Sequence, residues 1–61
     1  MTVPIAVQIE CAVREIKMRE YVYPKRVASG KMTQQKADAE LDAMKAIVET
    51  LREVEAKTRL I

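Results

Sequence analysis

The chain has 61 residues, of which 49% are hydrophobic and 33% are charged, and its net charge at pH 7 is +2. A domain of this length buries only about 60% of the surface that its unfolded chain exposes, so it gains little stability from its own core. One cysteine and no histidine exclude an intrachain disulfide and a zinc site built from cysteine and histidine. We therefore expect residues 1–61 to form a single small domain that gains stability by oligomerisation.

The first segment has the apolar period of an α-helix over about residues 4–22. Ile5, Ile9, Ala12 and Ile16 recur every three or four residues, and Tyr23 continues the same face. This spacing predicts a helix that buries one stripe of apolar side chains.

The ends of this first helix are predicted from Thr2 and Pro24. Threonine is a favourable N-cap, and Pro4 is tolerated in a first turn because its missing N–H has no partner within the helix. Proline disfavours the α conformation in the residue before it, so we expect the helix to end near Val22.

Residues 23–33 are expected to form a short helical turn that joins two helices. Pro24 suits the first position of such a turn, and Gly30 suits the left-handed residue that closes one. Thr33 is the expected N-cap of the second helix, although Lys36 stands where a full capping box has Glu or Gln.

The second helix is predicted over about residues 34–58, where the chain has no Gly or Pro. Two helices joined by a short turn form an antiparallel hairpin, so the expected fold is all-α. The apolar stripe of this helix consists of Ala37, Leu41, Met44, Val48 and Leu51, with Ile47 and Val54 extending it.

Apolar residues beside these two stripes predict that hairpins associate with one another. Small alanines on the second helix allow another helix to approach closely, and paired hairpins form a four-helix bundle with helices about 20° from antiparallel. We therefore expect a homodimer or a higher homo-oligomer. The flanking residues are Val7, Val13, Met18, Ala39, Ala43, Ala46 and Ala56.

No stretch of the sequence approaches 18 consecutive apolar residues, so we expect no membrane partner. The apolar N-terminus lacks the basic start of a signal peptide and is interrupted by Glu10. A single thiol is typical of a reducing compartment, and the expected location is the cytoplasm.

Positive charge is concentrated in residues 14–36, which carry seven Lys or Arg against two Glu and also contain both tyrosines. Cations beside an aromatic ring bind anions, and Tyr and Arg are frequent anchors of protein interfaces. Alternatively, this block is a solvated surface whose Tyr before the proline packs the end of the hairpin. The candidate binding residues, for a protein partner or an anionic ligand, are Arg14, Lys17, Arg19, Tyr21, Tyr23, Lys25, Arg26 and Lys31.

The sequence does not favour an enzyme. Cys11 is predicted to be a small buried hydrophobe, because there is no histidine to activate it. A single glycine excludes a glycine-rich phosphate loop, and a di-iron bundle requires histidines. We expect no catalytic residue, no metal site and no cofactor.

Residues 10–52 resemble a group of small uncharacterised bacteriophage and prophage proteins. The resemblance rests mainly on Val22-Tyr23-Pro24 and on Gly30-Lys31-Met32-Thr33-Gln34, and it extends to Ala46-Ile47. Residues 27–41 are similar, more loosely, to the bacterial SHOCT-type helix pair, in which a Gly-x-hydrophobic-Thr turn precedes a helix. The phage resemblance implies a small accessory protein in the cytoplasm of an infected bacterium.

Three functional hypotheses follow. The favoured one is a non-enzymatic, homo-oligomeric interaction protein that binds or inhibits a bacterial host protein, including a protein of host defence. The alternative is an oligomeric anion binder that sequesters a signalling nucleotide or contacts nucleic acid through the basic, tyrosine-containing block. The third is a purely structural bundle or a fragment of a larger assembly.

Overall fold

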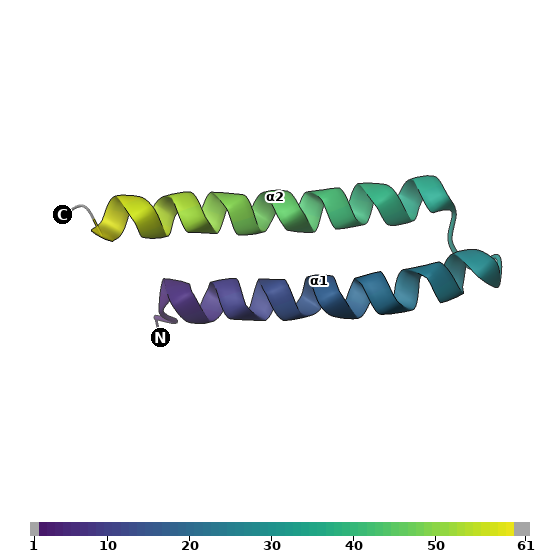
Figure 1. Ribbon diagram of the computed structural model, residues 1–61, viewed down its shortest axis with the longest axis horizontal. Coiled ribbons are helices and arrows are strands. Elements are labelled where there is room, and N and C mark those ends of the chain that lie inside the picture. The colour runs from purple at the N-terminus through teal and green to yellow at the C-terminus, as the bar shows by residue number, and fades with distance from the viewer. Residues whose placement is uncertain (1, 60–61) are drawn as a thin grey trace.

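The computed structural model describes residues 2–59 as an antiparallel helical hairpin (Figure 1). Helix α1 spans Ile5–Ala28 and helix α2 spans Gln34–Arg59. The start of α1 and the end of α2 lie at the same end of the hairpin, where α2 runs past the start of α1 (Figure 1). The predicted all-α hairpin is confirmed, and α2 begins at the expected residue.

The two helices contact each other through one stripe on each, which we call the inner stripes. Tyr23 is 9% exposed, Ala37 2% and Val48 7%, and these are the only buried side chains among the described residues. The other residues of the two inner stripes are half-buried. Both stripes alternate steps of four and three residues, which is the spacing of a two-helix coiled-coil seam. They consist of residues 5, 9, 12, 16, 19 and 23 on α1 and residues 37, 41, 44, 48 and 51 on α2.

Helix α1 continues through Pro24 to Ala28, so the predicted end near Val22 is wrong. Proline removes one helical hydrogen bond, here the bond to the carbonyl of Glu20, and costs about 3 kcal/mol in a helix interior. Both residues are exposed, so water surrounds the break. Continuing the helix places half-buried Val27 one turn beyond buried Tyr23 on the same face. Packing at the loop end therefore outweighs the local preference before a proline.

The turn after α1 is closed by Gly30, as predicted, with a positive φ of 79°. The N–H of Lys31 donates to the carbonyl of Arg26 over 2.9 Å, and the N–H of Gly30 donates to the carbonyl of Val27 over 3.1 Å. These two bonds form a Schellman motif, which satisfies carbonyls that the end of a helix leaves free.

Side-chain capping is confirmed for α2 and contradicted for α1. The N–H of Lys36 donates to Oγ1 of Thr33 over 3.1 Å, which is the N-cap bond expected there. At the start of α1 the N-cap is Pro4 rather than Thr2, and no side chain caps it. The carbonyl of Pro4 instead accepts the N–H groups of Val7 and Gln8.

The hairpin is long and thin, with extents of 48 × 20 × 17 Å and a radius of gyration of 14.4 Å. A compact domain of 61 residues has a radius of gyration of about 10 to 11 Å. Most side chains consequently face outward. Neither helix contains an apolar segment long enough to cross a membrane.

Candidate functional site

The predicted basic patch is divided by the fold, because its two tyrosines point to different sides of α1. Tyr21 is 68% exposed, whereas Tyr23 is buried against α2. Nζ of Lys25 lies 3.8 Å from the centroid of the Tyr21 ring, which is a cation–π contact. Tyr21 and Lys25 therefore form an exposed pair, while Tyr23 is a core residue and cannot anchor a ligand.

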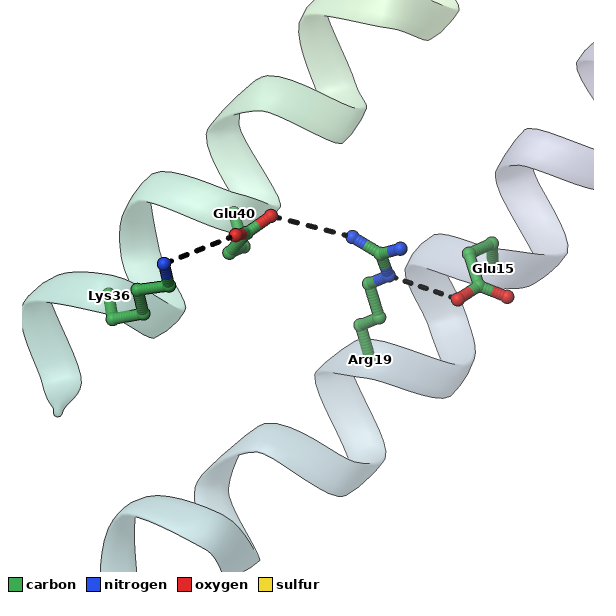
Figure 2. A network of polar contacts seen from close by, with 4 residues as sticks. All are labelled: Glu15, Arg19, Lys36 and Glu40. Carbon is green, nitrogen blue, oxygen red and sulfur yellow. Dashed lines mark hydrogen bonds and ion pairs between the residues drawn. The ribbon is translucent and has the colours of Figure 1, made fainter. Parts of the chain in front are cut away.

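Arg19 also leaves the predicted patch, because it occupies a position of the inner stripe. Its Nε donates to Oε1 of Glu15 over 3.0 Å, and its Nη1 lies 3.8 Å from Oε2 of Glu40 on α2. Lys36 Nζ lies 3.8 Å from the other oxygen of Glu40. Figure 2 shows these four side chains as one chain of charges that links the two helices.

This network directs the Arg19 guanidinium at carboxylates of its own chain. The Arg19 side chain is only 28% exposed, and the hydrogen bond to Glu15 is the main cause that raises the pKa of its guanidinium above the usual value. A guanidinium that already has two carboxylate partners is a poor site for an added anion. Arg19 is therefore a structural residue that aligns the helices.

The remaining predicted residues are exposed but do not form one surface. Arg14, Lys17 and Lys25 lie on α1, with Arg14 and Lys25 near the face of Tyr21. Arg26 follows Lys25 by one position, which turns it about 100° away. Lys31 lies beyond the end of α1, in the connection to α2. The structure thus retains a smaller cationic surface around Tyr21.

The prediction that Cys11 is buried is wrong. Its thiol is exposed, and Nη2 of Arg14 lies 3.3 Å from the sulfur. The prediction followed the usual burial of cysteine, but position 11 faces away from α2 because it falls between the inner-stripe residues Ile9 and Ala12. The described residues contain no cluster of three or more His, Cys, Asp or Glu that could hold a metal ion.

Six exposed residues of α1 form a second stripe, which we call the outer stripe. They repeat the four-three spacing of the inner stripe and lie on the opposite side of the helix. Val7 is 43% exposed, Met18 61% and Tyr21 68%. Only some of these residues were predicted to lie on a surface, although the regular four-three spacing in the sequence marks the whole stripe. The members are Val7, Cys11, Arg14, Met18, Tyr21 and Lys25.

Helix α2 has a second apolar surface beside its inner stripe, which we call the α2 flank. Ile47 and Val54 belong to it, with 48% and 47% exposure, so the prediction that they extend the inner stripe is wrong. The six residues span about 22 Å of helix at 1.5 Å per residue, and none of them is charged. The members are Ala39, Ala43, Ala46, Ile47, Thr50 and Val54, all of them exposed.

An open groove next to the inner stripes is a weaker candidate. It is lined by Ile9, Glu10, Val13, Arg14 and Arg52. A small-molecule site usually encloses its ligand and directs a few polar groups at it. This groove is shallow and borders solvent, so the outer stripe and the α2 flank are the stronger candidates for a binding surface.

Comparisons with known proteins add no relative. No family model, no curated protein and no solved structure matches the chain. The resemblance to small phage proteins and the looser one to SHOCT-type helix pairs therefore stay predictions.

Proposed function

We propose that the protein is a non-enzymatic interaction protein that acts as a homo-oligomer, in which paired hairpins form a helical bundle, and that it binds a protein partner in the bacterial cytoplasm. The observation that carries the proposal is the α2 flank, an uncharged surface of six exposed residues on a helix that already packs through another face. Scattered exposed apolar residues are normal, but a continuous apolar surface typically marks an interface.

The exposed area of the chain supports self-association. The hairpin exposes 5019 Å², whereas a compact monomer of 7.0 kDa exposes about 4,000 Å². The excess is about 1,000 Å² per chain. A stable protein interface buries about 800 Å² on each partner. Pairing of two hairpins would therefore bring the exposed area per chain down to that of an ordinary folded protein.

The α2 flank suits contact between two copies of the same surface. A twofold-symmetric contact brings each patch against a copy of itself, so a patch whose charges all have one sign faces the same sign on its partner. The six flank residues carry no charge, and four of them are Ala or Thr, which allow two helices to approach closely. Ile47 and Val54 then supply most of the apolar area.

The partner beyond the oligomer is proposed from two considerations. The outer stripe of α1 lies on the side of that helix away from α2, so an assembly through the α2 flank need not cover it. The resemblance to small phage proteins favours a bacterial host protein, and a factor of host defence is one such partner.

Light scattering and sedimentation of the purified chain test the assembly. We expect a mass of at least twice 7.0 kDa at micromolar concentration, and the double variant Ile47→Glu, Val54→Glu should shift this towards monomer by weakening association about a hundredfold or more. The matched control is Gln35→Glu, Lys45→Glu, which adds two glutamates at exposed positions of α2 outside the flank. A folded wild-type monomer would overturn the proposal.

A second variant covers the case in which the double glutamate variant unfolds. In a Cys11→Ser background, Ala46→Cys places a thiol at the middle of the α2 flank, and Lys45→Cys places one outside it. We expect rapid cross-linking of two chains through residue 46 and slow cross-linking through residue 45. Equal rates at both positions would exclude the flank as the contact between copies.

A further inference from the structure

We infer that the outer stripe of α1 is a docking seam for an acidic amphipathic helix of a partner protein. The inference rests on the proposed function, because it names the chemistry of the partner that the interaction protein would bind. It assigns this role to the exposed side of α1 rather than to the α2 flank.

The geometry of the outer stripe fits a helix. Positions 7, 11, 14, 18, 21 and 25 follow steps of four and three residues over about 27 Å, and all six side chains are exposed. A stripe with this spacing is the narrow seam of a coiled coil. A membrane surface, in contrast, requires a broad apolar face, and this stripe is interrupted by Arg14 and Lys25.

The charge of the outer stripe indicates an acidic occupant. Arg14 and Lys25 lie within it, Lys17 lies at its edge, and none of its six positions is a carboxylate. The nearest carboxylates on α1 are Glu10, at the edge near Arg14, and Glu15, which is already bound to Arg19. The part of the stripe from Arg14 to Lys25, four of its six positions, is therefore positive and exposed.

The same charge disfavours one way of pairing this stripe with a second copy of the chain. An antiparallel twofold pairing that sets Met18 against Tyr21 also sets Arg14 of one copy against Lys25 of the other. Two such like-charged contacts arise from the symmetry, and each opposes association. An acidic helix instead meets both cations with carboxylates, and Arg14 can bind one of them through two hydrogen bonds.

The apolar members of the stripe are suited to anchor such a helix. Tyr and Arg are enriched among residues that dominate binding energy, and Met adapts its shape to an irregular surface. Lys25 lies over the Tyr21 ring at 3.8 Å, so the exposed ring and the ammonium are held next to each other before binding. Both the apolar and the charged part of the contact are thus present in the free protein.

Binding of synthetic helical peptides tests this inference. The probes are labelled peptides of about 21 residues with Leu at the seam positions and Glu placed opposite Arg14 and Lys25 in each of three registers, and fluorescence anisotropy measures their affinity. We expect saturable binding of at least one peptide below about 100 µM. Raising the salt from about 50 mM to 500 mM should weaken it several-fold.

Variants locate the contact. Arg14→Glu with Lys25→Glu should reduce the affinity about tenfold or more, and a peptide with Lys in place of Glu should bind this variant better than it binds the wild type. Tyr21→Ala should also weaken binding. The matched control is Lys45→Glu with Lys57→Glu, which makes the same change of charge on α2 and should leave the affinity unchanged.

Other results of the binding experiment would overturn the inference. No saturable binding of any peptide, or equal losses in the seam and control variants, overturns the inference. Competition by ATP or by single-stranded DNA, to the same extent in the wild type and in the control variant, would show an anion site in place of a protein seam. Masses measured on the same samples separate this inference from the proposed assembly, because the seam variants should keep the wild-type mass.

Discussion

The inner and outer stripes of α1 have the same spacing but opposite surroundings. Each contains one tyrosine and one arginine. Tyr23 and Arg19 contact α2, whereas Tyr21 and Arg14 are exposed. Arg19 has carboxylate partners on both helices, whereas Arg14 contacts Cys11 and Lys25 contacts Tyr21, both on α1. A regular apolar period therefore identifies a surface that can pack, and the charges within it indicate what it packs against.

The largest expected difference between the stripes is in stability. Tyr23→Ala removes one of three buried side chains and should lower the free energy of unfolding by about 3 kcal/mol, as large-to-small changes of aromatic core residues do. Tyr21→Ala, two residues away, should change it by less than about 0.5 kcal/mol. Urea unfolding followed by circular dichroism measures both, at one fixed protein concentration because association adds to apparent stability. Similar losses in the two variants would show that Tyr21 is also packed.

Local signals in the sequence predicted the ends of elements well where backbone geometry decides them. Gly30 closes α1 because a left-handed residue is needed there, and Thr33 caps α2 because its hydroxyl reaches a free N–H. Pro24 misled the prediction, since packing of Tyr23 and Val27 at the loop end maintains the helix through it. Tertiary contacts of this kind have no local signature in the sequence.

The candidate site was predicted less well, because helical period leaves the direction of each face undetermined. Ile47 precedes the inner-stripe residue Val48 by one position, and a turn of about 100° moves it from the seam to the flank. Cys11 was predicted to be buried because cysteines usually are, although at its position on α1 the side chain is exposed. The stripe that α1 buries, from Ile5 to Tyr23, was predicted correctly, whereas the outer stripe was not recognised as one surface.

A smaller effect on stability is expected from replacing Pro24, which lies inside α1 near the loop end of both stripes. Pro24→Ala restores the N–H that the carbonyl of Glu20 lacks, but it also gives the unfolded chain more freedom. We expect a net stabilisation of about 1–2 kcal/mol in urea unfolding. The control is Glu20→Ala, which changes a neighbouring exposed residue without adding a donor. A destabilised Pro24→Ala variant would mean that the helix does not continue through this position.

The smallest effect on stability is expected at the two arginines, and there the stripes differ in function. Arg19→Met leaves Glu15 and Glu40 partly exposed, with side-chain exposures of 45% and 41%, so water solvates them and methionine fills the seam. We expect the melting temperature to shift by less than about 5 °C, since partly exposed ion pairs contribute little. Arg14→Met should also fold normally, yet it should weaken binding of the acidic peptide, which Arg19→Met should leave intact. Loss of peptide binding in both variants to the same extent would mean that Arg14 has no special place in the outer stripe.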